Sequence, residues 1–128
     1  MQFRIAMQSI LLSIFAAGIF PGFTSNPLED EVRQVEKIQP NPKMPLKEAE
    51  QVARLYFLYR FGGCGAYGQP LDKGTYWQFS TRIGYADTAG PSIFVEKATG
   101  MVSCPPGPSF KSPKALANAV IEKAASAK

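Results

Sequence analysis

The sequence predicts a single α+β domain in which helices pack on one face of a small antiparallel sheet of about three strands. An amphipathic stretch over residues 46–61 indicates a helix, and a capped segment starting at Ser112 indicates another. Between them lie three apolar or alternating stretches: 75–85, 92–96 and 101–104. The short connections between these stretches are typical of hairpins, whose strands run antiparallel. At 128 residues the chain has the length of one domain.

The N-terminus has the pattern of a secretory signal peptide. Arg4 precedes an apolar run over residues 5–20 that contains no charge, and Pro21-Gly22 ends the run. The run is short for a membrane span, although an uncleaved anchor is the alternative. We therefore expect residues 1–25 to be a signal peptide with a poorly marked cleavage site. The mature protein is expected in the bacterial periplasm, with no other membrane contact.

Residues 26–45 are expected to form a short helix and a proline-rich linker ahead of the domain at 46–128. Asn26 can cap a helix whose apolar residues recur at helical spacing up to Gln39. Three prolines in QPNPKMP (39–45) then stop it. We expect this segment to pack loosely or not at all.

The helix over 46–61 should end at a glycine in the left-handed conformation, either Gly62 or Gly63. Its second half is apolar nearly all round, so a second element, such as the N-terminal helix, or a partner should cover it. Arg60 in the last turn is expected to reach outward. The glycines that follow do not form a phosphate-binding loop, because that motif follows a strand and precedes a helix. We expect a flexible crossing loop over 62–74.

Alternation along the strand over 75–85 predicts two different faces. One carries Trp77, Phe79, Thr81, Ile83 and Tyr85, and the other carries Tyr76, Gln78, Ser80 and Arg82. The turn Ala98-Thr99-Gly100 suits a tight hairpin in which Gly100 takes a positive φ. Its role is predicted to be geometric, because one lysine and one hydroxyl do not define a phosphate or metal site.

Cys64 and Cys104 are the only cysteines in the chain. In an oxidising compartment two cysteines favour a disulfide, with free thiols as the alternative. A bridge between them closes a loop of about 40 residues, worth roughly 3–4 kcal/mol. A redox role is disfavoured, because the Cys-x-x-Cys spacing is missing.

The composition argues against several classes of function. The chain has no histidine, which removes the commonest general base and the commonest transition-metal ligand. Its 14 basic and 10 acidic residues are scattered rather than gathered into a basic stripe, which disfavours a nucleic-acid partner. An acid–base hydrolase using Asp72 or Asp87 with a tyrosine lacks a second, paired carboxylate. We expect no catalytic, cofactor-binding or metal-binding residue.

Three segments suggest a family: EAEQVARLYF (48–57), YWQFSTRIGY (76–85) and IFVEKATGMV (93–102). Over residues 46–110 the chain resembles small bacterial immunity proteins, of the immunity protein 35 and NTF2-fold immunity types. That resemblance implies a non-enzymatic protein that binds a cognate toxin and blocks its active site. The chain also resembles PepSY domains, exported modules linked to protease inhibition, although Lys97 stands where an acidic residue often precedes their turn. An exported protease-inhibitory or envelope-assembly module is therefore the alternative function.

The expected contact surface combines the loops 62–74 and 85–91 with the polar face of the first strand. Tyrosine and arginine are frequent anchors of protein interfaces. The candidate partner-binding residues are Tyr67, Tyr76, Arg82, Tyr85 and Asp87. The expected partner is a protein toxin, and a homodimer is left open.

Overall fold

The computed structural model describes residues 27–62, 65–84 and 88–126. The chain divides into residues 1–30 and a compact unit formed by 31–128. Of the first part only 27–30, the start of a helix, are described, so the predicted signal peptide and the Asn26 cap lie outside the described residues. The packing below concerns the compact unit.

The described residues have the predicted α+β class, but the sheet is larger than predicted. The helices are α1 (Pro27–Glu36), α2 (Leu46–Phe61) and α3 (Pro113–Ser126). The strands are β2 (Gly65–Asp72), β3 (Tyr76–Ile83), β4 (Thr88–Ala89), β5 (Ile93–Glu96), β6 (Val102–Ser103) and β7 (Ser109–Phe110). They pair antiparallel in the order β2-β3-β5-β6-β7, and β4 pairs with the end of β3. The predicted number of about three strands was therefore too low.

The strand β2 replaces much of the flexible loop expected over 62–74. It pairs with β3 along its whole length, with a bulge between Gly68 and Pro70 where Gln69 has a φ of 30°. Most of its side chains are exposed, so the sequence shows no apolar alternation there. Proline and glycine also depress strand propensity, yet an edge strand tolerates both. The sheet edge thus accepts a sequence that local rules assign to a loop.

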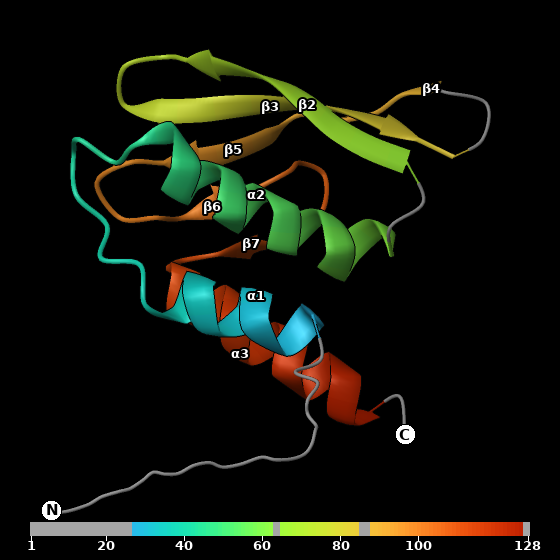
Figure 1. The fold of residues 1–128 in the computed structure, drawn as a ribbon. Coiled ribbons are helices and arrows are strands. Elements are labelled where there is room, and N and C mark those ends of the chain that lie inside the picture. The colour runs from blue at the N-terminus through green and yellow to red at the C-terminus, as the bar shows by residue number, and fades with distance from the viewer. Residues whose placement is uncertain (1–26, 63–64, 85–87, 127–128) are drawn as a thin grey trace, which may run out of the picture. The chain divides into compact units, whose positions relative to one another are not determined.

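The core lies between the sheet and the helices. The helix α2 packs against β2, β3, β5 and β6, while α3 packs against α2 and β7 (Figure 1). Both ends of the predicted helix 46–61 are confirmed, and α3 begins as predicted, with the Ser112 hydroxyl accepting a bond from the Ala115 amide. The side chains with no exposed surface include Ala49, Val52, Leu55, Tyr56, Phe79, Ile93, Val95, Val102 and Leu116.

The segment before α2 packs into the compact unit, so the expectation of loose packing was wrong. Val35, Ile38 and Met44 are buried, although α1 ends at Glu36 rather than at Gln39. The indole Nε1 of Trp77 donates to the carbonyl oxygen of Met44 at 3.0 Å. This bond ties the linker to β3, a contact between distant segments that no local pattern predicts.

The C-terminal half of α2 supports the proline-rich loop that follows β6. The buried hydroxyl of Tyr56 donates to the Pro108 carbonyl at 2.5 Å, and the Arg60 guanidinium donates to the Cys104 carbonyl. A Cβ at Gly107 would lie 2.3 Å from Cζ of Arg60, so only glycine fits there without movement. Arg60 therefore does not reach outward as expected, because its guanidinium is a second donor to the Cys104 carbonyl, which also accepts a bond from the Gly107 amide at 2.8 Å.

The predicted hairpin turn is confirmed, and its glycine also meets two other segments. Gly100 has a φ of 74°, and its amide donates to the Glu96 carbonyl at 2.8 Å. A Cβ at this position would lie 2.5 Å from Cδ of Pro113 and 2.9 Å from Cγ of Pro40. The turn is thus wedged between the linker and the start of α3.

Gly100→Ala is expected to lower the free energy of unfolding by about 2–4 kcal/mol. Roughly 1 kcal/mol comes from the left-handed backbone and the rest from overpacking against the two prolines. The matched control is Gly62→Ala, because Gly62 has a φ of 63° and nothing within 4 Å of its Cβ position. It should cost about 1 kcal/mol. Equal losses for the two variants in urea unfolding would contradict the wedge.

Candidate functional site

The two faces of the sheet have opposite characters. Along β3, Phe79 and Thr81 are buried on the side of α2, whereas Ser80 and Arg82 are exposed on the other side. The predicted alternation is therefore confirmed for this strand. We call the side away from α2 the outer face.

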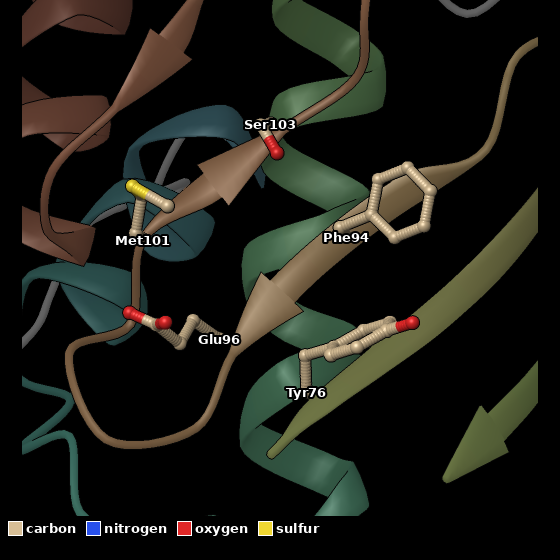
Figure 2. A pocket seen from close by; sticks show the side chains of 5 residues that line it. All are labelled: Tyr76, Phe94, Glu96, Met101 and Ser103. Carbon is tan, nitrogen blue, oxygen red and sulfur yellow. The ribbon is translucent and has the colours of Figure 1, made fainter. Parts of the chain in front are cut away.

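The outer face carries a shallow hollow of about 180 Å³. It is lined by Tyr76, Phe94, Glu96, Met101 and Ser103. Figure 2 shows these side chains in front of the strands and α2 behind them. Strand pairing brings them together, because Tyr76 lies opposite Glu96 and Phe94 lies opposite Ser103. Facing residues of an antiparallel pair project to the same side.

The hollow has an aromatic wall. The rings of Tyr76 and Phe94 have centroids 5.8 Å apart and meet edge to face at 66°. Met101 and Glu96 lie across the hollow from them (Figure 2). Such aromatic pairs add about 0.5–1.5 kcal/mol beyond burial, so they hold each other in place. The wall is therefore preorganised.

Further apolar surface lies on the outer face. Met101 is 37% exposed, and Leu71, which pairs with Gln78 and so shares its side, is 50% exposed. Between them the Gln78 amide donates to the Ser92 hydroxyl at 3.2 Å. The outer face therefore mixes large apolar side chains with a few fixed polar groups.

The hairpin turn fixes the carboxylate of Glu96. The Thr99 hydroxyl donates to Oε1 of Glu96 and accepts a bond from the Met101 amide at 3.1 Å. The turn residue Thr99 therefore has a second role besides turn geometry, since it orients an acidic side chain at the hollow.

Lys97 points to the other side of the sheet. It is only 8% exposed, and its Nζ lies 2.7 Å from Oδ1 of Asp72 and 4.9 Å from the ring centroid of Trp77. The hydrogen bond from Lys97, helped by the Gly74 amide, lowers the pKa of Asp72. Asp72, which the hydrolase hypothesis would need as an acid or base, is thus engaged in an ion pair.

The predicted partner-binding residues do not form one cluster. Tyr76 lines the outer-face hollow, and Arg82 is exposed farther along the same face of β3. Tyr85 and Asp87 lie outside the described residues. Tyr67 belongs to the opposite side of the sheet.

Tyr67 takes part in packing on the helix side. Its ring lies 6.4 Å from that of the buried Phe79, and its hydroxyl accepts a bond from Nε of Arg54 at 3.1 Å. The same Nε lies 3.4 Å from Oε1 of Glu31. Tyr67, Arg54 and Glu31 line a second hollow of about 360 Å³, together with Phe57, Leu58, Gly65 and Ala66. The polar groups of this hollow are paired with one another, so they are less available to a ligand or partner than the groups of the outer face.

Sequence reasoning missed Phe94, Glu96 and Met101. The alternation of IFVE did contain a signal, since Phe94 and Glu96 share one face of β5. To place them beside Tyr76, however, one needs the β3–β5 register, which depends on pairing between distant segments.

Cys104 is fully buried, belongs to no disulfide among the described residues, and has its Sγ 3.7 Å from the Pro91 carbonyl oxygen. Burial raises the pKa of this thiol. Cys64 lies outside the described residues, so the Cys64–Cys104 disulfide stays a prediction.

Two features are absent from residues 27–62, 65–84 and 88–126. No group of three or more Cys, Asp or Glu side chains there is arranged to hold a metal ion. Of the helices in this part of the chain, none has both the length and the apolar character needed to cross a membrane.

No protein-family model, curated protein or solved structure matches this chain. The resemblance of residues 46–110 to immunity proteins and to PepSY domains therefore stays a prediction.

Asp72→Asn is expected to destabilise the protein near neutral pH, because it leaves the Lys97 ammonium buried without its counter-charge. The folded pKa of Asp72 lies below its ordinary value of 3.8, so its contribution is fully present above that pH. The contribution is lost as the pH falls through the folded pKa. In urea unfolding, the free energy of unfolding should therefore be higher for wild type than for Asp72→Asn at about pH 7, and this difference should shrink at about pH 3. Glu122→Gln, at an exposed position of α3, is the control, and a stability difference that does not change with pH would contradict the pairing.

The disulfide is testable by alkylation of the exported protein in denaturant, with and without reductant. Denaturant is needed because burial and the raised pKa of Cys104 should slow the reaction of a free native thiol. Mass spectrometry should find no alkylated cysteine before reduction and two afterwards. Two alkylated cysteines without reductant would rule the bridge out. A Cys104→Ala variant should label once, at Cys64, under both conditions.

Proposed function

We propose that this protein is a non-enzymatic binding protein of the bacterial periplasm that neutralises a cognate protein toxin by covering its active site. The observation that carries the proposal is the outer face of the sheet. There the hollow lined by Tyr76, Phe94 and Met101 faces away from α2 (Figure 2). Inhibition by contact needs no nucleophile or general base on the inhibitor.

The residues of the outer face suit a protein interface. Tyrosine offers a large contact area with few rotatable bonds and is a frequent hot spot. Tyr76 is already braced by Phe94, so less side-chain freedom is lost on binding. Leu71 and Met101 add exposed apolar surface on the same side. Large apolar groups gathered on a surface are typical of interaction sites.

The support for a toxin as the partner, and for the periplasm as the location, comes from the sequence. The apolar run before residue 25 supports export, and the resemblance over 46–110 supports an immunity role. Toxins that attack the cell wall or the membrane act in the periplasm, so an exported immunity protein would meet them there. The PepSY resemblance supports the alternative, in which the covered active site belongs to a protease.

The partner can be captured through the hollow itself. A photo-crosslinking amino acid, p-benzoylphenylalanine, in place of Phe94 in the exported full-length chain should trap the bound protein for identification by mass spectrometry. The same residue in place of Ile121, which is 49% exposed on α3, is the matched control. A crosslink from position 94 alone is expected. Equal crosslinking from both positions, or none from 94, would contradict the proposed surface.

Tyr76→Ala and Phe94→Ala are each expected to weaken binding of the purified partner about tenfold, a loss of about 1.4 kcal/mol. Calorimetry measures the affinity, and the partner's own activity should be inhibited at one equivalent of wild-type chain. Ile121→Ala should bind like wild type. Wild-type affinity in both outer-face variants would reject this surface, and a partner with protease activity would favour the alternative function.

A further inference from the structure

The hollow on the outer face combines aromatic rings with one carboxylate. Tyr76 and Phe94 form one side, and Glu96 lies on the other beside Met101 (Figure 2). Among the described residues, Glu96 accepts its side-chain hydrogen bond from the Thr99 hydroxyl and belongs to no ion pair. The side of the hollow opposite the aromatic wall therefore presents a negative charge that the Thr99 hydroxyl orients but does not neutralise.

The nearest basic residue in sequence does not neutralise Glu96. Lys97 is directed to the opposite side of the sheet, where Asp72 and the Trp77 ring hold its ammonium. The same hairpin thus separates an acidic side chain on the outer face from a basic one on the inner face. Because Lys97 is 8% exposed and already paired, it is not available to Glu96.

The size of the hollow limits its occupant. Ligand pockets for drug-sized molecules measure about 300–1,000 Å³, whereas this one measures about 180 Å³. It is many times larger than the roughly 30 Å³ that one water molecule occupies. The volume suits a single long side chain inserted from a partner.

We propose that the hollow receives one basic side chain, a lysine or an arginine, from the protein partner. This inference rests on the proposed function. A cation beside Tyr76 and Phe94 would gain from the electron-rich ring faces, and its charge would meet the Glu96 carboxylate. The apolar stem of such a side chain would lie against Met101.

The local charge opposes the charge of the whole chain. The sequence carries a formal net charge of +4, which attracts acidic surfaces at long range. On the described part of the outer face, a basic side chain of the partner would find its counter-charge at Glu96. This would fix the register of the complex in addition to its affinity.

The test uses small probes of the side chain rather than an unidentified protein. The full chain is titrated with N-acetyl-lysine methylamide and N-acetyl-arginine methylamide, and amide NMR shifts are followed. N-acetyl-norleucine methylamide, which has a similar stem and no charge, and N-acetyl-glutamate methylamide are the controls. At least one basic probe should shift the signals of Tyr76, Phe94 and Met101, and the control probes should not.

Glu96→Gln should weaken binding of the basic probe about threefold to fivefold, since it removes the charge but keeps an acceptor for Thr99. Glu122→Gln should bind the probe like wild type. Equal shifts with norleucine, stronger shifts with the glutamate probe, or unchanged binding in Glu96→Gln would overturn the inference. Concentration-dependent shifts at the same residues without any probe would overturn it too, because a second copy of the chain would then be the occupant.

A second measurement separates this inference from the proposed function. With the crosslinked partner purified, Glu96→Gln should lose affinity, as Tyr76→Ala does. If only Tyr76→Ala weakens binding, the outer face is the interface, but the inference that it receives a basic side chain is wrong. If neither weakens it, the proposed surface itself is wrong.

Discussion

The register of the β5–β6 hairpin decides which side chains the sheet offers to a partner. Gly100 sets that register, since its positive φ closes the turn and its bare Cα fits between Pro40 and Pro113. A slip of one residue would move every side chain of the strand to the other face. Phe94 would then turn toward α2, and Val95, which is fully buried in the actual register, would turn outward. The core and the outer-face hollow thus depend on one turn.

The helix α2 supports this arrangement by satisfying polar groups where the sheet ends. The strands β6 and β7 are two residues each, so the loop between them has few ladder bonds of its own. Tyr56 and Arg60, one helical turn apart, donate to carbonyls at the two ends of that loop. Burial raises the pKa of Tyr56 above its ordinary value of 10.0, in keeping with a hydroxyl that donates rather than accepts. Together with the bond from the Gly107 amide to the Cys104 carbonyl, these bonds hold both ends of the loop to α2.

Local rules in the sequence determine the parts of the fold that were predicted well. The bounds of α2, the left-handed Gly62, the Ser112 cap and the Gly100 turn each depend on a few neighbouring residues. The errors involve distant contacts: β2 exists only because β3 pairs with it, and Arg60 is directed by a carbonyl 44 positions away. The candidate site divides in the same way. Alternation placed Tyr76 on the outer face, while Phe94 and Glu96 required the register between strands.

The outer face can vary without endangering the fold, which is what a recognition surface requires. The side chains with no exposed surface come from α2, α3, the inner sides of the strands and Cys104, and Tyr76 and Phe94 are not among them. Truncating either ring should therefore cost the fold less than the roughly 3–5 kcal/mol typical of a buried phenylalanine. Tyr67 is different, because its ring and hydroxyl join β2 to α2. Substitutions at Tyr67 would change stability and binding together, whereas those at the hollow should separate the two.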